Sequence, residues 1–239
     1  MTAVTRAMVL AAGLGERMRP LTETLPKPLI PLAGKPLIDH VLDGLAAAGV
    51  TRAVVNLHYL ADRLESHLQA RKRPEIIFSD EREAILDTGG GVARALPLIG
   101  GEPFFIHNSD SVWIDGVGSQ LARMAAVWDP ARMDALLLMA PTQSAIGYDG
   151  PGDFTMDEQG LLARRGEGEI APFAFAGASI AGRALFQDAP SGAFSLNRQW
   201  DRALEAGRLY GLRLDGTWMH VGTPAALDAA ERLMRGSGG

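Results

Sequence analysis

Cysteine is absent from the 239-residue sequence, which excludes a disulfide framework and any metal site built on thiolates. Long apolar runs are also missing, because no segment approaches the ~18 apolar residues of a membrane-spanning helix. There is no excess of positive charge either. The formal net charge of −5 argues against general binding to nucleic acid or to an anionic membrane surface. We therefore expect a cytoplasmic protein with neither nucleic acid nor membrane as a partner.

The remaining composition is that of an ordinary globular protein, with 47% hydrophobic and 21% charged residues. A chain of this length is long enough for one sizeable α/β domain and short for two. We expect a single domain over residues 1–239.

Short apolar runs alternate with amphipathic stretches along the chain. In the first half, residues 8–12, 52–57, 75–79, 103–107 and 135–140 are expected as strands, and residues 36–48, 60–70, 92–96 and 117–128 as helices. In the second half we expect a hairpin from residues 152–156 and 161–163, strands at 172–180 and 210–214, a helix that ends at Ala206, and a closing helix at 224–234 with Thr223 as its N-cap. The alternation predicts an α/β fold with a doubly wound, parallel sheet.

A glycine-containing segment follows the first expected strand. Gly13 and Gly15 allow a tight turn and close approach to a ligand, and main-chain N–H groups at such a turn can point at phosphate oxygens. Main-chain donors combined with nearby cations suit a triphosphate. The cations within residues 16–35 are Arg17, Arg19, Lys27 and Lys35, against only two acidic residues, Glu16 and Glu23.

Lys27 differs from the other cations in its surroundings. A loop lysine is most often a solvated surface residue. Pro26 and Pro28 flank this one and restrict the backbone around it, so its side chain can be held in one direction at little entropic cost. The pattern favours a cation held for a ligand over a mobile surface lysine.

Residues 10–22, LAAGLGERMRPLT, followed by Pro26-Lys-Pro28, resemble the signature of the sugar-1-phosphate nucleotidyltransferases. The resemblance continues to about residue 234. It implies a GT-A-like, Rossmann-related fold whose mixed, mostly parallel sheet is flanked by helices, with a nucleotide-binding half at about residues 1–141 and a sugar-binding half at about 142–235. It also implies that Ala11, Ala12, Gly13 and Gly15 bind the nucleoside triphosphate, with Arg17 on its leaving phosphates and Lys27 in the reaction centre.

A run of three glycines, 89–91, precedes the short helix expected at residues 92–96, which Pro97 would close. Glycines at a helix start can form a floor for a flat base or a ribose, or can simply belong to a loop. The segment resembles the nucleobase-contacting segment of uridylyl-transferring members of the family. That resemblance implies Thr88, Gly89 and Gly90 as nucleotide-binding residues.

Asn108 and Asp110 follow the strand expected at residues 103–107. Ligands of open α/β sheets lie at the carboxyl ends of the strands, and an Asp there can hold Mg²⁺ while water and substrate phosphates complete the coordination. An Asx-turn would use the same residues. The segment resembles the family's Asn-Gly-Asp element, with Ser109 in place of Gly. This implies that Asn108 contacts the nucleotide and that Asp110 is a catalytic metal ligand, with Mg²⁺ or Mn²⁺ as the cofactor.

The second half carries the segments that resemble the family's sugar site. Gly152, Asp153, Phe175 and Gly177 are implied as sugar-binding residues, and a glycine inside a strand often marks the close approach of another group. The chain departs from the family at position 220, where relatives carry an Asp that shares the metal and this sequence has His. Imidazole is a poor ligand for Mg²⁺. Three roles therefore stay open for His220: binding a softer metal, contacting a phosphate as a cation, or packing.

The resemblance as a whole implies an enzyme that transfers a nucleotidyl group from a nucleoside triphosphate, with UTP favoured, to a sugar 1-phosphate. N-acetylmuramate 1-phosphate of cell-wall recycling is the expected sugar. Alternatives are guanylyl transfer to a mannose or heptose phosphate, cytidylyl transfer to a choline-like phosphate, and a nucleotide-sensing subunit without activity, motivated by the missing second Asp. A dinucleotide-dependent oxidoreductase is disfavoured, because its Gly-x-Gly-x-x-Gly motif would need glycine where this chain has Met18.

Overall fold

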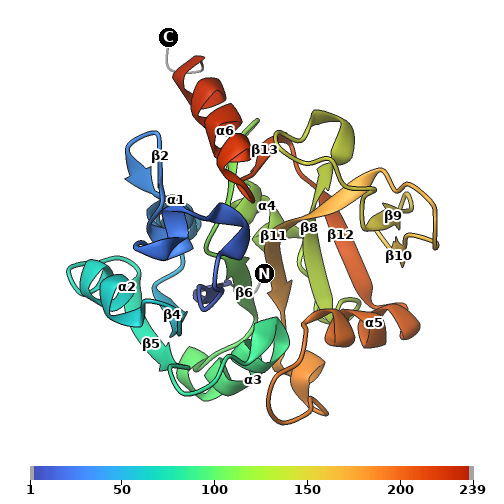
Figure 1. The fold of residues 1–239 in the computed structure, drawn as a ribbon. Helices are drawn as coiled ribbons and strands as arrows, with labels where there is room; N and C mark the ends of the chain where they lie inside the picture. Colours follow the sequence, from blue (N-terminus) through green and yellow to red (C-terminus); the bar gives the residue numbers. More distant parts are fainter. Residues whose placement is uncertain (1–2, 237–239) are drawn as a thin grey trace.

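A nine-stranded sheet forms the centre of the protein in the computed structural model, which describes residues 3–236 (Figure 1). None of the helices in this range is long and apolar enough to cross a membrane. The strands are β1 (Arg6–Leu10), β2 (Pro31–Leu32), β3 (Lys35–Pro36), β4 (Arg52–Leu57), β5 (Glu75–Asp80), β6 (Phe104–Asn108), β7 (Ser111–Asp115), β8 (Ala135–Pro141), β9 (Phe154–Met156), β10 (Leu162–Arg164), β11 (Phe173–Ala181), β12 (Leu209–Arg213) and β13 (Gly216–His220). The helices are α1 (Leu37–Ala47), α2 (Ala61–Leu68), α3 (Asp87–Ile99), α4 (Gln120–Val127), α5 (Asn197–Glu205) and α6 (Pro224–Gly236).

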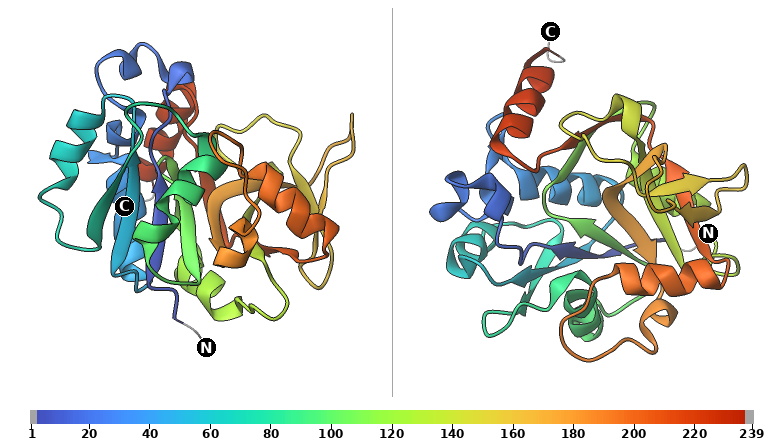
Figure 2. Two further views of the ribbon diagram at one scale, coloured as in Figure 1. Left: turned by 90° about the horizontal axis from the view of Figure 1, so that it is seen from below. Right: turned by 45° about the vertical axis from the view of Figure 1, so that its right-hand side comes forward.

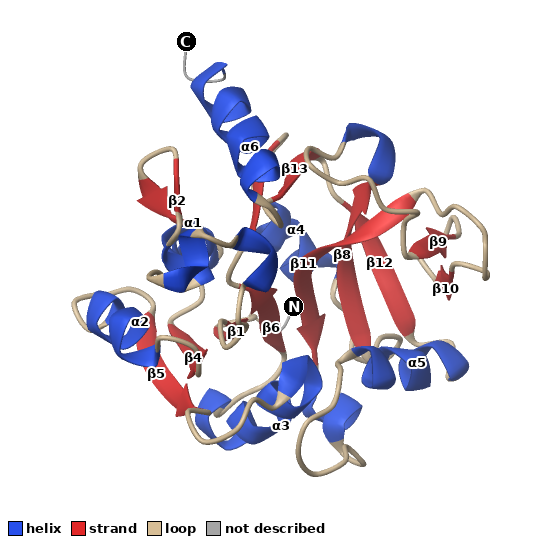
Figure 3. Ribbon diagram, viewed as in Figure 1, coloured by secondary structure: helices blue, strands red, loops and turns tan. Residues whose placement is uncertain are grey.

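Strands β5, β4, β1 and β6 are parallel neighbours in the sheet. Successive side chains of a strand point to opposite faces, and both faces of this part are covered. Ala7 and Val9 of β1 belong to the core formed with α1, α2 and α4, whereas Met8 belongs to the core formed with α3 and α5 (Figure 3). Burial on both faces explains why these strands are continuous apolar runs. The parallel α/β arrangement is confirmed here, and β4 has the expected bounds.

Strand β11 makes the sheet mixed. The mixed, mostly parallel sheet implied by the family resemblance is thereby confirmed, whereas the alternation of strands and helices had indicated only its parallel part. It lies antiparallel between β6 and β8, and its register against β8 shifts between Phe175 and Ser179. Beyond it, β8 pairs in parallel with β12. A strand from the second half of the chain thus lies between two strands from the first half. The division into a nucleotide-binding and a sugar-binding half at residue 141 stays a prediction.

Strands β7 and β13 form a separate antiparallel pair that no sequence pattern indicated. In this pair His220 lies opposite Ser111, which follows directly after Asp110. The residues that pair are far apart in the sequence, and neither strand has the long apolar run of the central sheet. The pairing places His220 beside the turn that carries Asp110.

Helix α3 begins at Asp87, so the expectation of a helix that begins at Val92 is wrong. The main-chain N–H groups of Gly89 and Gly90 donate to the carbonyl oxygen of Phe194 at 2.8 and 3.1 Å. Free N–H groups at a helix start need such acceptors, and here a distant segment supplies one. The glycines are therefore helical residues of the first turns, packed against residues 192–194.

Pro97 does not close α3, which continues to Ile99 and is followed by Gly100 in the left-handed conformation. The proline is exposed in the last turns of the helix, where water can satisfy a carbonyl group that loses its main-chain donor. The expected closing helix is confirmed as α6, and the N–H of Ala226 donates to Oγ1 of its N-cap, Thr223, at 3.2 Å. This helix projects from the body of the protein (Figure 2).

Replacing Gly90 by alanine should destabilise the fold. A Cβ at this position would lie 2.3 Å from the carbonyl oxygen of Gly192, a main-chain atom that cannot rotate away. Overpacking of this kind costs about 1–3 kcal/mol. For a chain of this size we expect the Tm to fall by ~3–10 °C, as measured by differential scanning calorimetry.

The matched control is Gly44→Ala in α1, where the added Cβ would lie 3.7 Å from Cδ1 of Leu121, an ordinary contact. Alanine is the better helix former, so this control should raise the Tm slightly. An unchanged Tm for Gly90→Ala would show that residues 192–194 are not held against α3 in solution.

Candidate active site

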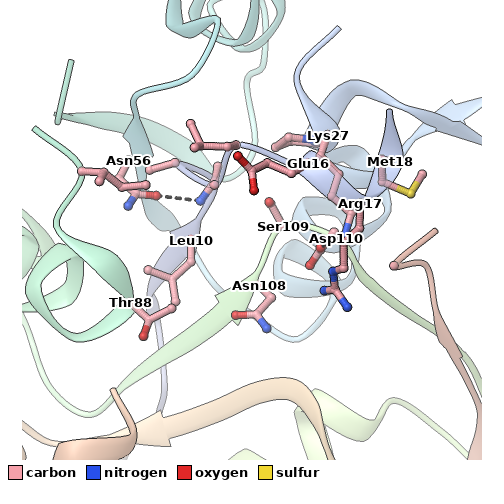
Figure 4. A pocket seen from close by; sticks show the side chains of 18 of the residues that line it. Leu10, Glu16, Arg17, Met18, Lys27, Asn56, Thr88, Asn108, Ser109 and Asp110 are labelled. Atoms are coloured by element: carbon pink, nitrogen blue, oxygen red, sulfur yellow. Dashed lines mark hydrogen bonds and ion pairs between the residues drawn. The ribbon is translucent and has the colours of Figure 1, made fainter. Parts of the chain in front are cut away.

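A cavity of about 560 Å³ opens at the carboxyl ends of β1 and β6 (Figure 4). This is the edge of an open α/β sheet where ligands bind. Most of the residues expected to bind the nucleotide line this cavity, although they come from separate parts of the chain. They are Ala11, Ala12, Gly13, Gly15, Arg17, Lys27, Thr88, Asn108 and Asp110.

A second cavity, of about 230 Å³, lies next to the first and is lined by Asp153, Phe175 and His220 together with Tyr148 and Trp218. Four residues line both cavities: Arg17, Lys27, Asn108 and Asp110. A molecule in the larger cavity and a molecule in the smaller one would therefore meet at these four side chains, which we call the junction. The junction carries two cations, one carboxylate and one amide.

The glycine-containing loop after β1 is held by contacts with the segment that leads to Lys27. Gly15 has a φ of +66°, a conformation that glycine adopts without strain. A Cβ on Gly15 would lie 2.9 Å from Cγ2 of Thr22 and 3.1 Å from Cβ of Lys27. The hydroxyl of Thr22 donates to the carbonyl oxygen of Gly15 at 2.9 Å. The hydroxyl of Tyr59 donates in turn to the carbonyl oxygen of Thr22 at 2.8 Å. The loop and Lys27 are thus fixed relative to each other.

The two cations of the junction differ in their partners. Nζ of Lys27 forms an ion pair with Oδ2 of Asp110, and the lysine side chain is only 14% exposed. The guanidinium of Arg17 has no hydrogen-bond or ion-pair partner within residues 3–236. Arg17 can therefore take an anionic ligand directly, whereas Lys27 must exchange its carboxylate for one.

His220 lies at the smaller cavity between aromatic rings. Its ring centroid is 5.8 Å from that of Tyr148, in edge-on contact, and 5.3 Å from that of Trp218. Burial lowers the pKa of His220, and the charges of Lys27 and Arg17 lower it further, while nearby carboxylates act in the opposite direction. The imidazole is thus mainly neutral at neutral pH in the ligand-free protein, which weakens the hypothesis of a permanent cation for a phosphate.

Gly152 and Gly177 have packing roles beside the smaller cavity and are not among the residues that line it. Gly152 has a φ of +79°, and a Cβ there would lie 2.2 Å from the carbonyl oxygen of Ala171. At Gly177, with a φ of +89°, a Cβ would lie 1.9 Å from Oγ of Ser111 and 3.3 Å from Nδ2 of Asn108. The close approach expected at Gly177 therefore exists, and the approaching groups are side chains of the protein. A direct contact of either glycine with a sugar stays a prediction.

Gly89 and Gly90 likewise lie inside α3 and do not line either cavity. A Cβ on Gly89 would lie 2.3 Å from Cε2 of Phe194, so glycine is needed there for packing. Thr88 does line the larger cavity, and its Oγ1 accepts from the main-chain N–H of Leu196 at 2.9 Å. Thr88 is thus placed to contact a ligand in this cavity, whereas the two glycines are not, and nucleotide binding by all three stays a prediction.

Several cavity residues were missed by the sequence analysis. Tyr148 and Trp218 had no assigned role, and Asn56 stands inside an ordinary apolar strand without any local pattern that marks it. The wall that each contributes depends on pairing with distant segments, such as β7 with β13. Residues that no expectation had assigned to a site include Asn56 and Ile85 at the larger cavity and Tyr148, Trp218, Met219 and Val221 at the smaller one.

Asp110 is suited to hold a divalent cation. Within residues 3–236, no group of three or more His, Asp or Glu side chains is placed to enclose a metal ion. Mg²⁺ is commonly bound by one or two carboxylates, with substrate phosphates and water as the other ligands. Asp110 lines both cavities, and Oδ1 has no hydrogen-bond partner in the described range. The donor set fits an ion held largely by the substrate, with His220 as a candidate second ligand for a softer metal.

Comparison with known proteins agrees with this architecture. Residues 6–149 match the model of the nucleotidyl transferase family. N-acetylmuramate alpha-1-phosphate uridylyltransferase of Caulobacter vibrioides is 49% identical over 229 residues, which cover 94% of this chain and 95% of that protein. The protein of the same name from Neisseria meningitidis serogroup B is 34% identical over 231 residues, which cover 95% and 97% of the two chains.

Solved structures show the same fold. The structure of UDP-glucose pyrophosphorylase complexed with UDP-glucose matches with a TM-score of 0.82 at 17% identity, covering 98% of this chain and 99% of that one. The single-domain, GT-A-like fold with a mixed, mostly parallel sheet is thereby confirmed.

Proposed function

The chain belongs to the nucleotidyl transferase family, and from this we propose that it transfers the uridylyl group of UTP to a sugar 1-phosphate and releases pyrophosphate. N-acetylmuramate 1-phosphate is the sugar that we propose, because two relatives that match nearly the whole chain carry this activity in their names. The product would be a nucleotide-activated sugar of cell-wall recycling.

The observation that carries the proposal is the meeting of two cavities at one set of charged side chains. The larger cavity contains the glycine loop and Arg17, which suit a triphosphate. The smaller cavity contains the aromatic rings of Tyr148, Phe175 and Trp218, and such rings present large apolar faces against which a sugar ring can pack. The α-phosphate of a nucleotide and the phosphate of a sugar would meet at the junction.

The reaction is a direct displacement at phosphorus. An oxygen of the sugar phosphate attacks the α-phosphorus in line, a new P–O bond forms, and the bond to the β-phosphate breaks with its electron pair leaving on pyrophosphate. Such a transfer needs no protein nucleophile and depends on positioning and charge neutralisation.

Each charged residue of the junction has a proposed part in this transfer. Arg17, which has no partner within residues 3–236, would bind the leaving phosphates. Lys27 would leave Asp110 and contact the α-phosphate or the sugar phosphate. Asp110 would hold Mg²⁺, which when bound neutralises phosphate charge and polarises the α-phosphate. Asn108, which also belongs to the junction, would orient the reacting groups.

Pyrophosphate release tests the proposal. Each of the four nucleoside triphosphates is combined with N-acetylmuramate, glucose or mannose 1-phosphate in Mg²⁺ or Mn²⁺. UTP with N-acetylmuramate 1-phosphate should be preferred over the other pairs by at least ~10-fold in kcat/KM. A preference for GTP or CTP would move the proposal to guanylyl or cytidylyl transfer. Nucleotide binding without turnover in either metal would favour the nucleotide-sensing alternative.

His220→Asp should strengthen the metal site. Both His220 and Asp110 line the smaller cavity, and a second carboxylate there adds a hard oxygen ligand. We expect the Mg²⁺ concentration for half-maximal activity to fall by about tenfold, the equivalent of ~1.4 kcal/mol, and any preference for Mn²⁺ or Co²⁺ to shrink.

The control is His220→Asn, which removes the imidazole without adding charge and should leave Mg²⁺ dependence nearly unchanged. If His220 instead meets a substrate phosphate as imidazolium, the carboxylate would repel that phosphate and activity would fall. The wild type would then lose activity as pH rises through the pKa of this histidine. Unchanged kinetics in both variants would leave only a packing role.

A further inference from the structure

A buried chain of hydrogen bonds links the ends of three neighbouring strands. The main-chain N–H of Ala11, just after β1, donates to Oδ1 of Asn56 at 2.6 Å. Nδ2 of Asn56, in β4, donates to Oε1 of Glu81 at 2.9 Å, and Glu81 directly follows β5. Asn56 and Glu81 are each 2% exposed. Side chains thus extend the pairing of these strands beyond the main-chain ladder.

Helix α3 is built to cover this chain closely. A Cβ on Gly91 would lie 3.0 Å from Nδ2 of Asn56 and 3.1 Å from Oε1 of Glu81, so glycine lets the helix pack directly on the pair. The surroundings therefore fix both side chains in one arrangement.

Keeping Glu81 here is costly for the fold. Its Oε2 is buried and has no hydrogen-bond partner in residues 3–236, and a buried polar atom without a partner is unfavourable. Burial raises the pKa of Glu81, which reflects the same penalty on the charged form. Apolar residues of similar size would fill this space without that penalty. The polar pair is therefore better explained by the site than by stability.

The pair acts at one end of the larger cavity. Asn56 lines this cavity but does not belong to the junction. In Figure 4, Asn56 and Thr88 lie on the opposite side of the cavity from Arg17 and Asp110. If the α-phosphorus is at the junction, the nucleoside lies toward Asn56. Glu81 does not line the cavity, but it accepts a hydrogen bond from Asn56, which does.

We propose that Asn56 and Glu81 are positioning residues for the nucleoside end of the substrate. Glu81 presents an acceptor to Asn56, which selects the amide orientation that turns Oδ1 toward Ala11. Asn56 then holds the Ala11 peptide in the floor of the cavity. This inference rests on the proposed function, and it predicts that the pair governs the affinity for the nucleotide and leaves that for the sugar phosphate unchanged.

Steady-state kinetics of complementary variants test the pairing. Glu81→Gln keeps an acceptor for Asn56 and should change the KM for UTP by less than about threefold. Asn56→Asp sets two carboxyl groups against each other and should raise that KM by at least ~10-fold. In the double variant Asn56→Asp/Glu81→Gln, the glutamine amide can donate to the new carboxylate. The KM for UTP should then return to within about threefold of the wild type.

The KM for the sugar phosphate is the readout that separates positioning from general damage, and it should stay within about threefold in every variant. Glu81→Leu is the second test variant, because it removes the acceptor without adding charge and should also raise the KM for UTP. Thermal unfolding of each variant establishes which variants are folded, and only the KM values of folded variants are compared.

Two results would overturn the positioning role. One is a double variant whose KM for UTP stays as high as that of Asn56→Asp. The other is an equal rise in both KM values in the folded single variants. A wild-type protein that turns over no nucleotide would instead contradict the proposed function, so the two failures are distinguishable.

Discussion

Lys27→Ala should lower kcat by ~10²–10³, the loss seen when one oriented charge-stabilising group is removed from a reaction centre. The side chain is only 14% exposed and is held between the glycine loop and Asp110. It belongs to both cavities and therefore lies where charge would develop on the transferring phosphate. Single-turnover kinetics of pyrophosphate release would measure the loss, and the fold should survive because Lys27 contributes little to the apolar cores.

The matched control is Lys35→Ala. Lys35 belongs to the same basic segment but is 41% exposed, and its ammonium group pairs with Asp43 at 2.6 Å, outside the two cavities. Its removal should leave kcat within about threefold of the wild type. If Lys27→Ala also keeps kcat within about threefold of the wild type, the lysine contributes less than ~1 kcal/mol to transition-state stabilisation. That result would show that Lys27 is not part of the reaction centre.

Asp110→Asn should reduce turnover by at least ~10²-fold. Loss of a partner that merely orients a metal ligand costs 10–100-fold in metal affinity or activity, and loss of the ligand itself should cost no less. The amide oxygen can still accept from Lys27, so the ion pair is replaced by a hydrogen bond and the turn after β6 should keep its shape. Triphosphate binding should largely persist, because Gly13, Gly15 and Arg17 are unchanged.

A titration with Mg²⁺ distinguishes this role from a structural one. Excess Mg²⁺ should restore only part of the activity of Asp110→Asn, since the amide oxygen is a weaker ligand than a carboxylate. Asp115→Asn is the control: this residue lies at the other end of β7, and Oδ1 accepts from Trp113 and from the N–H of Gln120, which an amide oxygen can also do. A wild-type metal dependence in Asp110→Asn would place the metal ligand elsewhere.

The parallel part of the central sheet could be read from the sequence because β1, β4 and β6 are buried on both faces. Continuous apolar runs are the local consequence of that burial, and β4 was bounded correctly at residues 52–57. The glycine loop and the cations of the junction were also found, because they lie within one short segment with a recognisable pattern. The amino-acid types and their local spacing were sufficient for these features.

The glycines of the second motif show where local reasoning ends. Gly89 to Gly91 looked like a loop before a short helix, yet all three are helical. Their need for glycine comes from neighbours distant in the sequence, namely residues 192–194 for the first two and the pair of Asn56 and Glu81 for the third. A sequence pattern does not record which distant atoms approach a given Cα.

The sequence by itself thus determined the fold class, the parallel core of the sheet and the presence of a glycine-containing loop with a fixed lysine beside it. The tertiary structure alone decided that β11 lies antiparallel inside the sheet, that β13 pairs with β7 and that His220 consequently lies beside Asp110. It also decided that Asn56, which lines the larger cavity, forms a hydrogen bond with the buried Glu81. The physical reason is the range of the interactions. Hydrophobic periodicity and turn chemistry act over a few neighbouring residues, whereas strand pairing and side-chain convergence depend on contacts between segments far apart in the chain, which form only when the whole core is packed.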